Sequence, residues 1–191
     1  QSFFDLEQEK IFLSSWQLVC HENDIPEPGS YMTYSLLNNR AFVMRVDPGE
    51  IKAFHNVCRH RAHLLLDADL GHTPNCRIVC PYHPWGYATD GQLTAAPYMD
   101  GSKHFNPDRC RLPSYRLETW AGFIFVNLDD NAPTLASRMT TLEGYIDNYR
   151  VGGQVEIMHY VDEWAGNLKL SAENSMEYYH HVGLHKDTVQ E

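Results

Sequence analysis

Two short pairs of cysteine and histidine offer the clearest capacity for chemistry in this sequence. Cys58 and His60 are separated by one residue, Cys80 and His83 by two, and nineteen residues lie between His60 and Cys80. Each pair follows a segment rich in β-branched residues, so each is expected in a loop that ends a strand. Two such loops that face each other would supply two thiolates and two imidazoles to a metal centre.

Two kinds of metal centre use this ligand set. A structural zinc ion takes two Cys and two His in a tetrahedron, whereas a Rieske [2Fe–2S] cluster takes two Cys on one iron and two His on the other. The spacing alone does not choose between them. A zinc finger normally carries its two histidines on a helix, and here each pair mixes Cys with His on a β loop, which favours the Rieske cluster.

A second group of potential ligands lies between Glu173 and His185. It comprises His180, His181 and His185, with Glu173, Asn174 and Glu177 as oxygen or amide donors. A mononuclear Fe(II) site that activates O₂ needs two His and one carboxylate, with positions left open. Helix geometry favours His181 with His185, whereas His180 and His185 converge only if the helix bends or ends between them, for example at Gly183. Geometry leaves both pairings open.

The elements that must position these residues are mostly short strands. We expect an amphipathic helix over 4–17, followed by segments broken by turn formers such as Pro28-Gly29 and Pro48-Gly49. The segments 41–46, 51–57, 77–83, 87–93 and 115–128 are rich in β-branched and aromatic residues. Short strands at this spacing predict an all-β sandwich or barrel.

The β domain is expected to end near residue 130. A helix is predicted over 134–149, a strand over 155–164 that opens a new domain, and a helix over 171–185 capped by Ser171. The expected organisation is a helix and lead-in over 1–40, a cluster domain over 41–130, and the start of a further domain over 131–191. One strand and one helix do not make a core, so we expect the rest of that domain to lie outside this sequence.

Composition excludes several other functions. The 191 residues are 43% hydrophobic and 21% charged, as in globular proteins. The formal charge of −10, without a long basic run, argues against nucleic acid as a partner. Apolar runs are far shorter than the roughly 18 residues of a membrane span, and the acidic start lacks signal-peptide features. We therefore expect a cytoplasmic protein that does not enter membranes, and the odd count of five cysteines argues against a disulfide framework.

The residues around both metal pairs resemble one family. NVCRHRA at 56–62 and CPYHPWGYATDGQL at 80–93 are similar to the two cluster-binding boxes of the Rieske non-haem iron oxygenases, large subunit. Pro84 departs from the family, which more often has a small or polar residue there, and this affects loop stiffness rather than ligation. The resemblance implies a mostly β fold: a Rieske-type antiparallel β sandwich or barrel with a cluster-binding subdomain, followed by the beginning of an α+β helix-grip catalytic domain.

The second group also resembles this family. The pattern Glu-Asn-x-x-acid-x-Tyr-His-x₄-His falls on Glu173, Asn174, Glu177, Tyr179, His180 and His185. The resemblance implies that His180 and His185 bind a mononuclear Fe(II) and that Asn174 lies near it. It also implies that Glu177 bridges this iron and the cluster of a neighbouring subunit. The third ligand, a carboxylate, would come from beyond Glu191.

The family implies a function. Its members use O₂ and electrons from NADH or NADPH, passed by a flavin reductase and sometimes a ferredoxin, to hydroxylate or oxidatively demethylate a small organic substrate. They assemble as homotrimers or α3β3 complexes. A Glu at position 177 resembles oxygenases of quaternary ammonium compounds, with aromatic substrates as the other option. The alternatives from other classes are a Rieske ferredoxin-like electron carrier, which has no need of His180 and His185, and a zinc-stabilised binding module.

Overall fold

The structure is a computed structural model that describes residues 2–188. The chain divides into two compact units, Gln1–Val155 and Glu156–Glu191, which are considered separately. Within residues 2–188, no helix has the length and apolar character needed to cross a bilayer.

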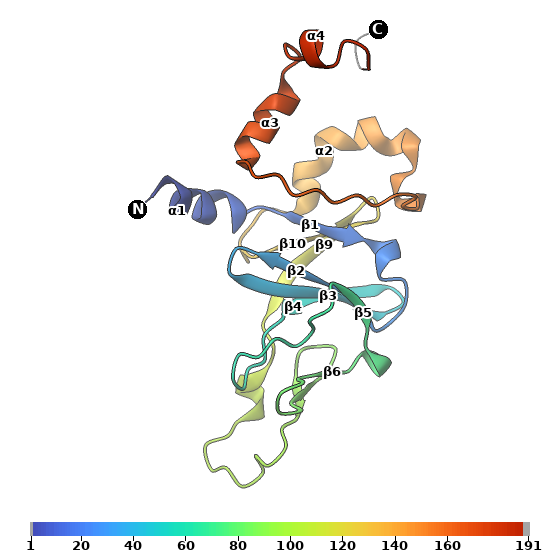
Figure 1. Cartoon of the computed structure of the whole chain (residues 1–191). Helices are drawn as coiled ribbons and strands as arrows, with labels where there is room; N and C mark the ends of the chain where they lie inside the picture. Colours follow the sequence, from blue (N-terminus) through green and yellow to red (C-terminus); the bar gives the residue numbers. More distant parts are fainter. Residues whose placement is uncertain (1, 189–191) are drawn as a thin grey trace. The chain divides into compact units, whose positions relative to one another are not determined.

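The first unit is built on a seven-stranded antiparallel sheet (Figure 1). Its strands are β1 (Gln17–His21), β2 (Ser30–Leu36), β3 (Asn39–Asp47), β4 (Glu50–His55), β5 (Leu70–His72), β9 (Ser114–Trp120) and β10 (Phe123–Asn127). They lie in the order β1-β10-β9-β4-β3-β2-β5, and every neighbouring pair is antiparallel. The predicted all-β, antiparallel class is therefore confirmed.

A smaller three-stranded sheet forms a subdomain at one end of this unit, drawn in green at the lower end of Figure 1. It consists of β6 (Ile78–Val79), β7 (Gly86–Tyr87) and β8 (Leu93–Ala95), flanked by 3₁₀ turns at Pro74–Cys76 and Pro107–Cys110. The second Cys/His pair lies in the connection between β6 and β7, and the first pair follows β4. The chain thus carries both pairs to the same end of the unit.

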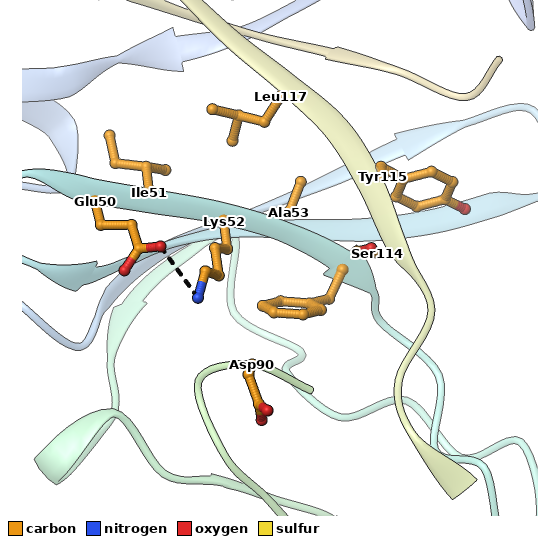
Figure 2. A pocket seen from close by; sticks show the side chains of 9 residues that line it. Glu50, Ile51, Lys52, Ala53, Asp90, Ser114, Tyr115 and Leu117 are labelled. Atoms are coloured by element: carbon orange, nitrogen blue, oxygen red, sulfur yellow. Dashed lines mark ion pairs between the residues drawn. The ribbon is translucent and has the colours of Figure 1, made fainter. Parts of the chain in front are cut away.

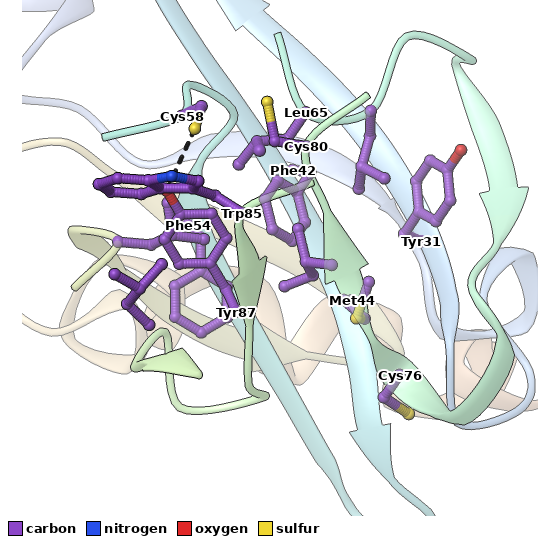
Figure 3. Close-up of a cluster of buried hydrophobic side chains, with 14 residues drawn as sticks. Tyr31, Phe42, Met44, Phe54, Cys58, Leu65, Cys76, Cys80, Trp85 and Tyr87 are labelled. Atoms are coloured by element: carbon purple, nitrogen blue, oxygen red, sulfur yellow. Dashed lines mark hydrogen bonds between the residues drawn. The ribbon is translucent and has the colours of Figure 1, made fainter. Parts of the chain in front are cut away.

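Alternating side chains of β3 and β4 build two cores. Phe42, Met44 and Phe54 pack with Trp85 and Tyr87 between the large sheet and the subdomain (Figure 3). The intervening residues Val43 and Ala53 face the other way and pack with Ile25, Ile124 and Val126. This two-residue alternation is what a sheet covered on both faces requires.

Several strands differ from their predicted extents. The run predicted over 115–128 is a hairpin, with its turn at Ala121 and Gly122, both at positive φ (50° and 83°). A Cβ at Gly122 would overlap His21 Nε2, so glycine is required there for space as well as conformation. The segments predicted as strands over 77–83 and 87–93 contain only β6 and parts of β7 and β8. Their other residues form loops.

The helices of the first unit follow the expected caps. Helix α1 (Phe3–Glu7) begins with a capping box between Ser2 and Asp5 and continues as a π-helical segment, Gln8–Phe12, so the prediction of 4–17 is too long. Helix α2 (Leu135–Ile146) is capped by Thr134 and continues as a 3₁₀ turn, Asp147–Tyr149, which confirms the helix predicted over 134–149. Two further 3₁₀ turns cover Glu22–Asp24 and Val151–Gly153.

The second unit contains α3 (Leu168–Met176) and α4 (His181–Leu184). The strand predicted over 155–164 is wrong for the described residues, which form no ladder there; apolar side chains such as Ile157 are exposed. A strand needs a neighbour to pair its backbone groups. The single helix predicted over 171–185 is also wrong, because α3 is capped by Asn167 rather than Ser171 and the chain is extended at Glu177.

The buried side-chain amide of Asn56 holds the first cluster loop, the residues 56–66 that contain Cys58 and His60. The side chain of Asn56 donates to the carbonyl oxygen of Leu66 (2.6 Å) and accepts from its N–H (2.9 Å), and Asn56 is 2% exposed. The two bonds close the loop that contains Cys58 and His60.

We therefore predict that Asn56→Ala lowers the free energy of unfolding by about 2–4 kcal/mol, because two buried backbone groups lose their partners. Urea denaturation measures this loss. Asn131→Ala, at an exposed position, is the control and should change stability by less than about 0.5 kcal/mol. Equal effects of the two substitutions would contradict the role of Asn56.

Candidate metal centre

Backbone hydrogen bonds close the first cluster loop into a compact turn. An isolated bridge joins Val57 and Leu64, the N–H of Cys58 donates to the carbonyl of His63 (2.8 Å), and the N–H of Ala62 donates to the carbonyl of Cys58 (3.0 Å). Ala62 has a positive φ of 56°, which completes the turn. Backbone bonding thus fixes the direction in which Cys58 and His60 project.

The second loop is the connection of a short hairpin. The N–H of Cys80 donates to the carbonyl of Trp85 (2.8 Å), and β6 pairs with β7 on either side. His83 and Tyr82 lie between these two anchors. The chain therefore reverses tightly between Cys80 and Trp85, and this reversal contains His83.

The four predicted ligands meet. Cys58 and Cys80 are 3% and 2% exposed, and burial, together with the neighbouring Cys80 thiol, raises the pKa of Cys58. The rings of His60 and His83 lie with centroids 4.8 Å apart, inclined by 69°. The thiols form the buried side of the site and the imidazoles its half-buried side. A Rieske cluster needs this arrangement, with two Cys on one iron and two His on the other.

The polar atoms of the site fit such a cluster. Among the described residues, His83 Nδ1 is one of three buried side-chain polar atoms without a hydrogen-bond partner. A buried, unpaired nitrogen costs free energy that a bond to iron would offset. Burial also raises the pKa of the Cys58 thiol, so a cation beside it is what would favour the thiolate. No three His, Cys, Asp or Glu side chains in residues 2–188 are arranged to hold one ion.

Tyr87 touches the site from the core. Its hydroxyl lies 3.2 Å from Cys58 Sγ and accepts a hydrogen bond from the N–H of Arg59 (3.1 Å) (Figure 3). Because the Arg59 N–H donates to a lone pair of the Tyr87 oxygen, the proton of the Tyr87 hydroxyl can point at Cys58 Sγ. Burial and the bond to Cys58 raise the pKa of Tyr87, so the hydroxyl remains a donor.

Aromatic rings cover both histidines. The Trp85 indole stacks on His60 with centroids 4.6 Å apart and planes inclined by 7°. Tyr82 packs on His83 at 3.8 Å. Burial, the neighbouring His83 and the Arg61 charge, in that order, lower the pKa of His60, which favours the neutral imidazole that binds metal.

The second predicted group is partly assembled. In the second unit, the ring centroids of His180 and His185 lie 5.4 Å apart. The ring centroid of His181 lies 4.6 Å from that of His180 and 5.4 Å from that of His185. The break at Glu177 and the short helix α4 bring these rings together, and either pairing fits these distances. The Glu177 carboxylate accepts from His180 Nδ1 and from the N–H of Tyr179, and the bond to His180 is the main cause of its lowered pKa.

Glu173 and Asn174 lie apart from these histidines, on the exposed α3. Asn174 lines a cavity of about 440 Å³ with Asp162, Trp164 and Leu170. In the first unit, a cavity of about 370 Å³ lies against β4 and β9 (Figure 2). Its lining includes the Glu50–Lys52 ion pair (3.2 Å) and none of the predicted site residues.

Comparison with known proteins gives the class of the chain. Residues 15–116, more than half of the sequence, match the family described as Rieske [2Fe-2S] domain. The chain is 33% identical to the carnitine monooxygenase oxygenase subunit of Acinetobacter baumannii, over 98% of this chain and 51% of that protein. It is also 33% identical to the glycine betaine monooxygenase oxygenase subunit of Pseudomonas aeruginosa, over 100% of this chain and 44% of that protein.

Solved structures agree. The apo form of the quaternary ammonium Rieske monooxygenase CntA superposes with a TM-score of 0.87 at 30% identity, over 95% of this chain and 53% of that chain. Naphthalene 1,2-dioxygenase from Rhodococcus sp. gives a TM-score of 0.69 at 32% identity, over 75% and 33%. The chain spans about half the length of the relatives that it matches.

The sheet, the two loops and this match define a Rieske [2Fe–2S] protein. The chain belongs to the Rieske [2Fe-2S] domain family, and it is similar to the N-terminal part of the large subunits of Rieske non-haem iron oxygenases. Membership of this domain family implies a Rieske cluster, and the relatives, which also carry a mononuclear iron site, are oxygenase subunits. The alternatives of a ferredoxin-like carrier and of a zinc module are not supported.

Sequence reasoning missed two residues of this site. Sequence analysis includes Tyr87 only within the second box, CPYHPWGYATDGQL, and Asn56 only within the first box, NVCRHRA. Strand alternation could have pointed to Tyr87, since a buried tyrosine beside a ligand loop needs a partner for its hydroxyl. The partner of Asn56, ten residues away along a loop, has no periodic signal.

We predict that Tyr87→Phe lowers the reduction potential of the cluster. The hydrogen bond to Cys58 Sγ stabilises the reduced, more negative cluster more than the oxidised one. A difference of about 1–2 kcal/mol corresponds to roughly 40–90 mV for one electron. A redox titration followed by EPR measures this shift. Tyr31→Phe, in the same core but distant from Cys58 in Figure 3, is the control and should leave the potential unchanged; a shift of similar size there would refute the assignment.

Proposed function

We propose that this chain serves in a terminal oxygenase that passes electrons from a Rieske cluster to a mononuclear Fe(II), where O₂ is activated to hydroxylate or oxidatively demethylate a small organic substrate. The convergence of Cys58, His60, Cys80 and His83 is the observation that carries this proposal. The histidine cluster in the second unit of the same chain supports it, because an electron carrier alone has no use for a second metal site.

Each side chain has a defined part in this proposal. Cys58 and Cys80 hold one iron of the cluster, His60 and His83 the other, and His180 and His185 hold the mononuclear iron. When bound, the cluster supplies one-electron transfer and the mononuclear iron supplies the site of O₂ reduction. Tyr87 donates to Cys58, and Trp85 shields His60 from water.

Glu177 orients His180 through the bond to Nδ1, which is how a carboxylate fixes the ring of a metal-ligating histidine. By family resemblance, it also bridges to a His of the cluster on a neighbouring subunit. The same resemblance implies that Asn174 lies near the mononuclear iron. The carboxylate that completes the iron site lies outside residues 2–188.

The proposed substrate is a quaternary ammonium compound. The named activities of the relatives on carnitine and glycine betaine support this choice, and so does a Glu at position 177. The named activities of the dinitrotoluene and naphthalene enzymes make an aromatic compound the competing class. Incubation with ¹⁸O₂ and a panel of both classes distinguishes them by the product that carries the label.

The proposed partners are a flavin-containing reductase that oxidises NAD(P)H, with a ferredoxin in some systems. The proposed assembly is a homotrimer or an α3β3 complex, and the proposed location is the cytoplasm. The need for NAD(P)H supports that location. Neither nucleic acid nor membrane has a part in this function.

Three neighbouring histidines allow a matched test of the iron ligands. The test uses the protein as the cell makes it, supplied with its reductase. His180→Ala and His185→Ala should each reduce product formation by more than about 100-fold, because loss of a metal ligand lowers activity more than loss of a residue that only hydrogen-bonds to a ligand. The cluster signal in EPR should remain. His181→Ala is the control and should retain most activity; loss with this variant and retention with His180→Ala would assign the other pair.

Glu177 can be tested in the same way. We predict that Glu177→Ala lowers product formation by about 10–100-fold, with the potential and EPR signal of the cluster unchanged. Glu177→Asp should recover part of the activity, because it keeps the carboxylate. Full activity of Glu177→Ala would show instead that Glu177 is a solvated surface charge.

A further inference from the structure

Three aromatic rings make consecutive contacts beside the candidate metal centre. The Trp85 indole stacks on the His60 ring, with centroids 4.6 Å apart and planes inclined by 7°. The Phe105 ring meets the same indole in an edge-to-face arrangement, with centroids 5.6 Å apart and planes inclined by 67°. Trp85 is 4% exposed. This buried indole therefore connects a candidate metal ligand to a residue that lies outside both cluster loops.

The orientation of the Trp85 indole depends on these ring contacts. The backbone carbonyl of Trp85 accepts a hydrogen bond from the N–H of Cys80 (2.8 Å), which places the backbone of this residue. Within residues 2–188, the indole N–H donates no hydrogen bond to another protein group, so the side chain is held by His60 and Phe105. Edge-to-face contact favours a defined angle between two rings, which an aliphatic neighbour does not.

The connection that carries Phe105 is attached to the core by three side chains. It covers residues 96–106, between β8 and the 3₁₀ turn Pro107–Cys110. Ala96, Met99 and Phe105 are partly buried and pack against the core cluster that contains Trp85. Three backbone hydrogen bonds, each spanning three residues, fold the chain between Ala96 and Phe105 into consecutive turns. These turns and contacts fix the position of Phe105 against the indole.

We infer that Phe105 is a positioning residue for the metal centre: it holds the Trp85 indole flat on His60, and the indole fixes the plane of that imidazole. Among the described residues, the Phe105 ring contacts Trp85 and neither His60 nor His83. Groups around the ligands set the orientation of a ligand and the access of water, and both change the reduction potential of a metal site. The inference rests on the proposed function, since it requires a cluster ligated by His60.

Removal of the Phe105 ring tests this inference in the cluster-loaded protein as the cell makes it. In Phe105→Ala, the indole loses the neighbour that fixes its angle, and water gains access to His60. Pulsed EPR of the reduced cluster in D₂O should then show about twofold deeper modulation from exchangeable deuterons. The reduction potential should rise, because water stabilises the reduced, more negative cluster more than the oxidised one. Unchanged modulation and potential would overturn the inference.

Three further variants separate the effect of the ring from general effects of substitution. Tyr98→Ala truncates an aromatic side chain of the same connection that is 100% exposed, and it should change neither measurement. Phe105→Tyr keeps the ring and should retain both original values. If Phe105→Ala does not fold, Phe105→Leu takes its place, because leucine keeps apolar volume without the ring, and both values should change in the same directions. Equal effects of Tyr98→Ala and Phe105→Ala would contradict the role of Phe105.

A double-mutant cycle tests whether Phe105 acts through Trp85. In a Trp85→Met background, where a flexible side chain fills the same part of the core, Phe105→Ala should produce no further change of potential or modulation. Equal changes in the two backgrounds would show that Phe105 acts independently of the indole, against the inference. A chain with no Rieske EPR signal before substitution refutes the proposed function itself, whereas a Rieske signal that Phe105→Ala leaves unaltered refutes the positioning role alone.

Discussion

The meeting of two loops from different parts of the sequence is the constraint on which the rest of the first unit depends. It brings two buried thiols near each other and leaves His83 Nδ1 buried without a partner. Such an arrangement is unfavourable for the polypeptide alone, because buried polar atoms lose their bonds to water. The large sheet supports the first loop through β4 and Asn56, and the small sheet supports the second through β6 and β7. The core of Phe42, Phe54, Trp85 and Tyr87 holds the two sheets together.

The site is also asymmetric, and the asymmetry suits electron transfer. The two thiols face the core, where the Tyr87 hydroxyl lies 3.2 Å from Cys58 Sγ, and the two imidazoles face the surface beneath aromatic rings. Hydrogen bonds to sulfur raise the potential of an iron–sulfur cluster, as does the replacement of two thiolates by neutral imidazoles. In the proposed function, burial of the thiols and the neighbouring Tyr87 hydroxyl therefore adjust the potential of the cluster.

The fold class and the two loops of the candidate metal centre could be predicted from the sequence, whereas several element bounds could not. The pairs at Cys58 and Cys80 carry their ligands at short spacing, so two local turns suffice to define them, and the resemblance supplied the choice of cluster. The alternation of β3 and β4 likewise follows from local pattern. The hairpin turn at Ala121 and Gly122 was missed because the apolar run continues through it.

Other features depend on contacts that no local pattern contains. The segment 155–164 has strand composition, yet its residues are unpaired in the described part of the chain. The helix predicted through Glu177 ends there because this side chain bonds the backbone of Tyr179 and His180, which competes with the helical hydrogen bonds. Trp164, Tyr178 and Tyr179 are exposed among the described residues. The resemblance named His180 and His185 where geometry alone left the pairing open.

Pulsed EPR on the dithionite-reduced chain labelled with ¹⁵N-histidine tests most directly whether Cys58, Cys80, His60 and His83 hold a Rieske cluster. We expect hyperfine couplings from two histidine nitrogens on one iron, with one coupling lost when His83 is replaced by cysteine. A reduced cluster without histidine couplings, or a colourless chain that contains zinc and no sulfide, would contradict it.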